Sequence, residues 1–157
     1  MINRFIGGSN IVNLKYRLNK IQYKHIINFI GEKGNFYNEN SLLASSFKNK
    51  YITLKLTSLW LPNENIAYDN ALKISKIAIE NDNKILIDAE DHNINKSISK
   101  IANSLIDIYN KDEINIYRTH QMYYQDSISY LENQLKLYPN SGIKLVRGAY
   151  LNQDSKY

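Results

Sequence analysis

The sequence predicts an α/β fold, part of a (β/α)8 TIM barrel with about five parallel strands and intervening helices. Short apolar runs alternate with segments of helical periodicity, and the connections between them are short. This alternation is typical of parallel strands joined by right-handed crossovers. The runs are almost continuously apolar, as expected for strands covered on both faces. The chain has no glycine-rich loop of the dinucleotide or P-loop type, which favours a barrel over an open nucleotide-binding sheet.

Length and composition fit one globular domain. The chain has 157 residues, with 43% hydrophobic and 22% charged residues. It has no cysteine, which excludes disulfides, thiolate metal sites and a cysteine nucleophile. The net charge is +5, but the lysines are scattered instead of forming a basic stripe, so no nucleic-acid partner is expected. No apolar run approaches the ~20 residues that span a bilayer.

The chain begins with a predicted helix and a short strand. Ser9 and Asn10 are favoured N-cap residues, and the apolar residues that follow share one helical face: Ile11, Leu14, Leu18 and Ile21. The run His25–Ile30 is closed by Gly31 and predicts a strand that ends at Glu32. Residues Gly34–Lys50 are polar with a weak apolar centre and indicate either a short helix or a loop.

The middle of the chain predicts two strands around a helix. Tyr51–Leu59 is rich in β-branched and apolar residues, which indicates a strand. Asn65–Asn81 predicts a helix. Lys84–Glu90 predicts the third strand, and its last residues Asp88 and Glu90 alternate, so we expect both side chains on the same side.

The last third of the chain repeats this alternation. A helix is predicted by five isoleucine and leucine residues at helical spacing: Ile94, Ile98, Ile101, Leu105 and Ile108. Ile114–Thr119 predicts the fourth strand, and Asp126 or Ser127 caps the helix that follows it. After the turn Tyr138–Gly142, an apolar run predicts a fifth strand ending at Arg147.

Polar side chains stand at the carboxyl end of every predicted strand. In a (β/α)8 barrel these ends converge on one site. A helix cap or a surface ion pair would explain any one of them, including Arg147, but five in succession favour one shared pocket. The residues are Glu32, Lys55, Thr57, Asp88, Glu90, Thr119, Gln121 and Arg147.

Two other kinds of site have little support. His92 follows Asp88 and Glu90 closely, but it lies beyond the predicted strand, where it would not point inward with them. We therefore expect no metal site. No local pattern suggests a Ser–His–Asp triad.

Several of these segments resemble, in order, the strands of the proline dehydrogenases, flavoproteins that oxidise proline. The run from Lys144 to Tyr150, Lys-Leu-Val-Arg-Gly-Ala-Tyr, resembles the family's fifth strand. Asp88-Ala-Glu90 resembles its third strand, and Thr119-His-Gln-Met-Tyr123 its fourth, with His120 where the family usually has tyrosine. Lys55-Leu-Thr57 resembles the second strand, and Ile26–Glu32 more weakly the first.

The resemblance implies a function and residue roles. It implies oxidation of L-proline to 1-pyrroline-5-carboxylate, with electrons passing through FAD to a quinone. Arg147 and Gln121 would contact the flavin ring, the first as a cation near its reactive nitrogen and the second through its amide. Lys55 and Asp88 would line the space between flavin and proline, and Glu32 would pair with a substrate-binding arginine.

The resemblance also implies that residues 1–157 are an incomplete domain. The family's barrel continues through three more strands and a last helix, which hold the arginines that bind the proline carboxylate and much of the FAD site. Two function classes stay open: an enzyme fragment that needs a complementing chain, or a non-catalytic remnant. Family members are mitochondrial in eukaryotes, and otherwise cytoplasmic or peripheral to a membrane. The basic, acid-poor segment before Glu32 fits either a transit peptide or part of the fold, and we favour the fold.

Overall fold

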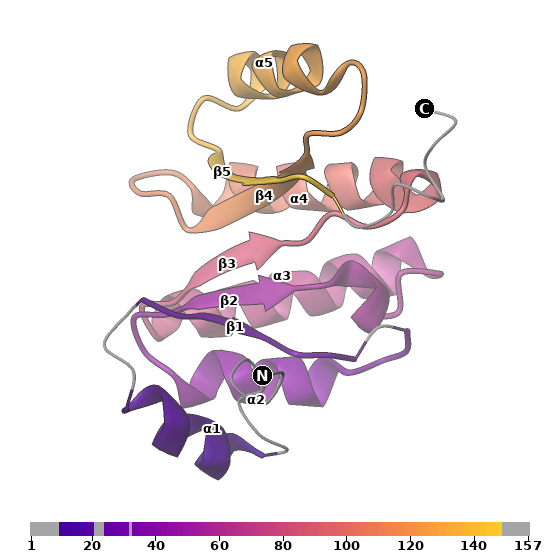
Figure 1. Cartoon of the computed structure of the whole chain (residues 1–157). Helices are drawn as coiled ribbons and strands as arrows, with labels where there is room; N and C mark the ends of the chain where they lie inside the picture. The colour runs from indigo at the N-terminus through magenta and orange to yellow at the C-terminus, as the bar shows by residue number, and fades with distance from the viewer. Residues whose placement is uncertain (1–9, 21–23, 32, 149–157) are drawn as a thin grey trace.

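The computed structural model describes residues 10–20, 24–31 and 33–148. The described strands form one fully parallel sheet in the order β1-β2-β3-β4-β5, so each strand pairs with its neighbour in the chain (Figure 1). This sequential order is that of a barrel wall. The strands are β1 (Ile26–Asn28), β2 (Tyr51–Leu54), β3 (Lys84–Ile87), β4 (Ile116–Gln121) and β5 (Gly142–Val146).

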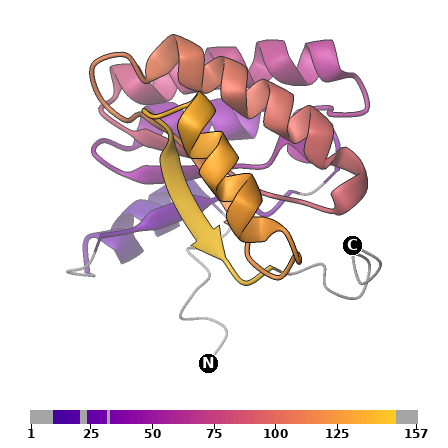
Figure 2. The same cartoon turned by 90° about the horizontal axis from the view of Figure 1, so that it is seen from above.

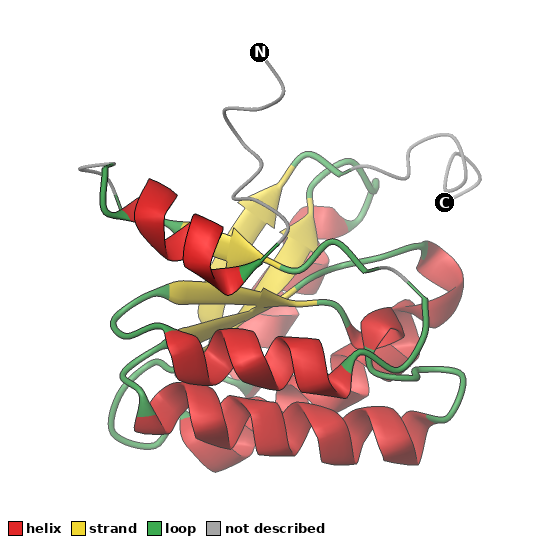
Figure 3. Ribbon diagram, turned by 90° about the horizontal axis from the view of Figure 1, so that it is seen from below, coloured by secondary structure: helices red, strands yellow, loops and turns green. Residues whose placement is uncertain are grey.

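Helices connect the strands and form a second layer, which is plain when the molecule is seen from below (Figure 3). The predicted alternation of strands and helices is therefore confirmed, and the ambiguous segment after β1 is a helix. The helices are α1 (Ile11–Leu18), α2 (Tyr37–Ser46), α3 (Glu64–Glu80), α4 (Asn95–Tyr109) and α5 (Ser127–Leu137). Asn10 caps α1, because its side chain accepts a hydrogen bond from the backbone of Asn13 at 2.9 Å.

The main core lies between the sheet and helices α3 and α4. Alternate residues of the central strands, such as Ile52, Ile85 and Ile116, are buried against one apolar stripe of each helix. A smaller cluster around Ile27, Leu43 and Phe47 joins β1 to α2 and takes up the apolar side of α1. The residues between them in each strand point to the opposite face of the sheet. At the carboxyl edge this face carries polar side chains.

All the predicted strands except the fourth end earlier than expected. The second runs only from Tyr51 to Leu54, and the chain then turns into a short 3₁₀ helix at Leu56–Ser58. The prediction to Leu59 was wrong because the turn buries its own leucines completely, so the apolar pattern continues past the end of the strand. The third strand likewise stops at Ile87.

Asn110, the residue that follows α4, fills a gap in the sheet before β5 begins. It is almost fully buried and makes four hydrogen bonds to backbone groups. Its Oδ1 accepts from the N–H groups of Asn115 and Ile116, and its Nδ2 donates to the carbonyls of Ile116 and Asn140, all at 2.8–2.9 Å. One side chain thus satisfies backbone groups of β4 that have no neighbouring strand at this point.

Helix α5 lies nearest the viewer in Figure 2, and polar side chains of this helix bond to β4 and α4. Gln134 is its one buried residue. Arg118 on β4 is 5% exposed and donates to Gln134 at 2.5 Å, to Tyr130, and to Ser99 and Asn103 of α4. These partners are uncharged, so the network joins two helices and a strand around a buried guanidinium.

Candidate active site

A cavity of about 430 Å³ lies at the carboxyl ends of the strands. Its lining comes from all five strands or the residues just after them, which is where ligands bind in parallel α/β folds. The lining residues are Asn28, Lys55, Asp88, Ala89, Thr119, Gln121, Lys144, Val146 and Gly148.

An ion pair crosses the cavity. Lys144 Nζ donates to Asp88 Oδ1 at 2.6 Å, and both side chains are largely buried, with 25% and 15% exposed. Lys144 belongs to β5 and Asp88 follows β3, so the bond passes across β4. Lys55 lines the same cavity, which therefore presents two ammonium groups and one carboxylate among its described residues.

Strand β4 contributes two side chains to this cavity. Gln121 is 6% exposed and Thr119 is 7% exposed. Thr119 pairs with Lys144 in the register of β4 and β5. The Oγ1 atom of Thr119 is buried and has no hydrogen-bond partner in the described structure.

Glu90 lies close to the cavity but has a different partner from Asp88. It is 6% exposed, and it accepts hydrogen bonds from Thr57 Oγ1 at 2.6 Å and from the Thr57 backbone at 3.2 Å. Burial raises the pKa of the Glu90 carboxyl, and the bonds from Thr57 oppose that rise. Both carboxylates follow the end of β3, and repulsion from Asp88 adds to the rise in the pKa of Glu90, so the expectation that they share one side stays a prediction.

His120 faces away from the cavity. Its ring is buried against Tyr130, with ring centroids 6.2 Å apart, on the side of the sheet that carries helix α5. Burial and the neighbouring Arg118 lower the pKa of His120 to about 4. The replacement of the family's usual tyrosine by histidine at this position therefore lies on the outer face of β4.

The structure brings together in the cavity four of the residues predicted for the shared pocket, namely Lys55, Asp88, Thr119 and Gln121. Arg147 follows β5, is exposed, and is not among the residues that line the cavity. Glu32 lies outside the described residues. The cation that β5 supplies to the cavity is Lys144, which was not singled out as a site residue. Strand alternation could have identified it, because Lys144 and Val146 share a face that Arg147 does not.

Gly148 shapes the rim next to β5. Its φ of +115° favours glycine, and a Cβ at this position would stand 1.7 Å from the ring of Tyr123. A glycine at this position is thus required by the close approach of an aromatic ring.

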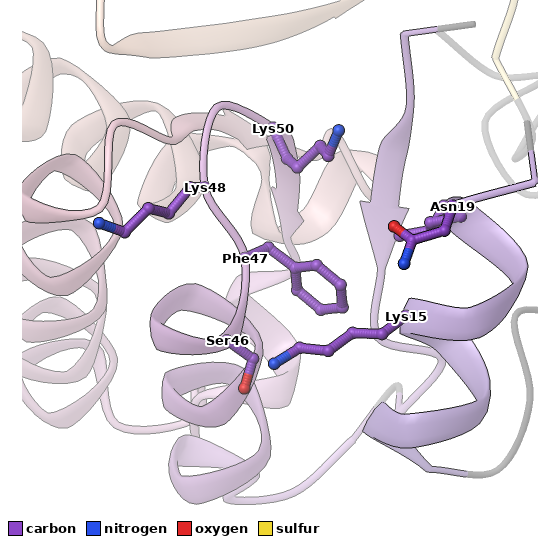
Figure 4. A pocket seen from close by; sticks show the side chains of 7 residues that line it. Lys15, Asn19, Ser46, Phe47, Lys48 and Lys50 are labelled. Carbon is purple, nitrogen blue, oxygen red and sulfur yellow. The ribbon is translucent and has the colours of Figure 1, made fainter. Parts of the chain in front are cut away.

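A second cavity, of about 260 Å³, lies near the amino end of β2 (Figure 4). Three lysines line it, but they do not converge. Lys15 extends past the ring of Phe47, with Nζ 5.8 Å from the ring centroid, whereas Lys48 points away. We therefore take the cavity at the carboxyl ends as the candidate active site.

A sequential parallel sheet with a charged cavity at its carboxyl edge is the architecture of part of a (β/α) barrel. Residues 14–157 match the family model described as Proline dehydrogenase. The chain belongs to the proline dehydrogenase family.

Named relatives match parts of the chain. It is 34% identical over 87 residues to proline dehydrogenase 1, mitochondrial, of Caenorhabditis elegans, covering 53% of the chain. It is 31% identical over 108 residues to the Drosophila melanogaster protein of the same name, covering 64%. A hydroxyproline dehydrogenase of Xenopus laevis is 34% identical over 88 residues, covering 54%. The matches cover 14%, 16% and 19% of these relatives, respectively.

Solved structures share the fold. Proline utilization A (PutA) of Bdellovibrio bacteriovorus, inactivated by N-propargylglycine, superposes with a TM-score of 0.77 at 14% identity, covering 98% of this chain and 21% of that one. A PutA mutant of Bradyrhizobium japonicum gives a TM-score of 0.71 at 17% identity, covering 95% and 18%. At these identities the likeness concerns the fold alone.

Proposed function

We propose that this chain forms the first five strands of the catalytic barrel of an FAD-dependent proline dehydrogenase. The reaction is the oxidation of L-proline to 1-pyrroline-5-carboxylate. The main support is the cavity where Lys55, Asp88, Gln121 and Lys144 meet at the carboxyl ends of four strands. Because the chain matches a fifth or less of its relatives, residues 1–157 would be an incomplete domain that needs the remaining strands.

The cavity residues fit the ring system of a flavin. When bound, FAD would accept the hydride that leaves proline. Gln121 offers an amide that can both donate and accept at a ring edge. Lys144 places a positive charge in a largely buried position, where it favours negative charge that develops on a neighbouring group. The unpartnered Oγ1 of Thr119 is a further polar atom in the cavity.

Lys55 and Asp88 would act on the substrate side. Asp88 fixes the position of the Lys144 ammonium through their 2.6 Å bond. Its carboxylate also keeps two lysines together in one small cavity, since it offsets part of their mutual repulsion. The two ammonium groups of the lining would suit an anionic group of the substrate, such as a carboxylate.

Arg147 and Glu32 keep the roles that the family resemblance implies. In our proposal Arg147 approaches the flavin from the rim, and Glu32 pairs with a substrate-binding arginine outside this chain. Replacing Arg147 by methionine would then slow flavin reduction, and a rate equal to that of the parent protein would remove Arg147 from the site.

The proposal extends to partners and location. Electrons would pass from FAD to a quinone, and the protein would be mitochondrial if it is eukaryotic, as the names of two relatives suggest. Otherwise it would be cytoplasmic or peripheral to a membrane. No helix among the described residues is long and apolar enough to cross a bilayer.

Anaerobic reduction of the flavin tests the proposal. The whole natural protein that contains this chain is loaded with FAD, and the visible flavin absorbance is followed after L-proline is added. We expect bleaching with L-proline and none with D-proline. Replacing Lys144 by methionine should slow bleaching by about 10²–10³-fold, the usual effect of losing one preorganised electrostatic partner.

A second candidate function is a non-catalytic remnant or a half-barrel that needs a complementing chain. The open edges of β1 and β5 in the described sheet favour the half-barrel. If the whole natural protein binds no FAD alone but gains flavin when mixed with a chain that supplies the missing strands, the half-barrel is correct. Absence of flavin in both cases supports the remnant.

A further inference from the structure

We propose that Thr119 is a ligand-binding residue, and that its hydroxyl donates a hydrogen bond to the polar edge of the flavin ring system. This inference rests on the proposed function and adds one residue to it. It also predicts that the buried, unpartnered hydroxyl of Thr119 lowers the stability of the ligand-free protein, which can be measured separately.

The position of Thr119 allows a ligand contact. It lies on β4, opposite Lys144 in the register of β4 and β5, and it lines the cavity. The neighbouring residues Arg118 and His120 contact the helices on the other face of the sheet. Alternation along β4 therefore directs Thr119 into the cavity.

The hydrogen bonding of Thr119 is incomplete. Its side chain is more than nine-tenths buried, and Oγ1 finds no partner in the described structure. A buried hydroxyl normally bonds to protein or water, because desolvating it without a partner is unfavourable. Valine has nearly the same shape and would avoid that cost, so a threonine here is explained by a partner that arrives with the ligand.

The surrounding charges indicate which partner this is. Lys55 and Lys144 line the same cavity and are donors only. A ligand atom that lies among them is therefore an acceptor, and the Thr119 hydroxyl would donate to it. Ring carbonyl oxygens and unprotonated ring nitrogens of a flavin are acceptors of this kind.

A comparison of two buried hydroxyls separates ligand binding from packing. Ser75 lies in α3, is fully buried, and its Oγ also lacks a partner, but it does not line the cavity. Thr119→Val, Thr119→Ser and Ser75→Ala are made in the whole natural protein. Thermal unfolding is measured without FAD, and FAD affinity is measured by quenching of flavin fluorescence.

We expect Thr119→Val to unfold at the same temperature as the parent protein or higher, yet to bind FAD about tenfold more weakly, the effect of one lost hydrogen bond. Thr119→Ser keeps the hydroxyl and should retain most of the affinity. Ser75→Ala should leave FAD affinity unchanged.

Three outcomes would overturn the inference. If the parent protein binds FAD and Thr119→Val binds it equally well, Thr119 is not a ligand residue, although the proposed function stands. If Thr119→Val unfolds at a clearly lower temperature without FAD, the hydroxyl already has a partner in the protein. If the parent protein binds no FAD, the proposed function fails and this inference fails with it.

Discussion

The ion pair between Asp88 and Lys144 should behave as a buried interaction that holds the cavity together. A double-mutant cycle tests this, using Asp88→Asn, Lys144→Met and the double variant. Asp88 is the carboxylate of the described cavity lining, which also contains Lys55. We therefore expect Asp88→Asn to cost more than Lys144→Met, because it leaves the largely buried Lys144 ammonium without its carboxylate partner while Lys55 lines the same cavity.

The geometry sets the size of the coupling. At the 2.6 Å separation of Nζ and Oδ1, two unit charges attract by about 6 kcal/mol at an effective dielectric constant of about 20. Desolvation of the largely buried groups offsets most of this, and hydrogen bonds to charged groups retain about 1.5–3 kcal/mol. The expected coupling free energy is about 2 kcal/mol.

Thermal unfolding at fixed protein concentration measures the cycle, repeated in low and high salt. The control is the pair Lys76–Glu80 on α3, which is 3.9 Å apart with side chains 69% and 61% exposed. Exposed pairs at this spacing contribute about 0.3–0.5 kcal/mol and are screened by salt. A coupling between Asp88 and Lys144 as small as the control, or equally reduced by salt, would refute a buried pair.

Three further predictions follow from the fold. Because burial raises the pKa of Glu90, the folded protein binds that proton more tightly than the unfolded chain, so this carboxyl favours folding less as pH rises through its folded pKa. In unfolding measurements, the stability of Glu90→Gln relative to the parent should therefore increase as the pH rises above the ordinary range of a carboxyl, and a pH-independent difference would contradict this. Asn110→Ala should cost about 4 kcal/mol at about 1 kcal/mol per hydrogen bond, against less than about 1 kcal/mol for Asn81→Ala, which loses one bond; equal unfolding temperatures would show that water replaces Asn110. Residues 1–157 alone should associate or lose fixed packing, because β1 and β5 leave strand edges open in the part of the sheet that the structure describes, and a sharp monomer peak in size-exclusion chromatography with light scattering would oppose this.

The order and type of the elements could be predicted because the short apolar runs of the strands differ clearly from the helical spacing of apolar residues in the helices. The stripe of α4 and the apolar run of β3 appear directly in the residue pattern. The ends of β2 and β3 could not be predicted in the same way. The turn after β2 buries Leu56 and Leu59 as deeply as the strand buries Leu54, so hydrophobicity does not change where the hydrogen-bond ladder stops.

The candidate site was predicted in part. Lys55, Asp88 and Gln121 were found because each follows an apolar run, and strand ends converge in a parallel sheet. Lys144 was missed because Arg147 stands nearer the end of the apolar run, whereas the register with Thr119 determines which side chain of β5 enters the cavity. The hydrogen bond between Thr57 and Glu90 joins the 3₁₀ helix after β2 to the segment after β3 and leaves no periodic signal in the sequence.

The sequential strand order also affects how the protein can be made. Ile26 pairs with Tyr51, Tyr51 with Lys84, and Ile85 with Ile116, so each new strand docks on the one synthesised just before it. Every such contact closes a loop of a single βα unit, which keeps the entropy of loop closure small. The sheet can therefore grow from its first strand while the ribosome is still translating the next helix, and at each stage the unpaired edge belongs to the newest strand.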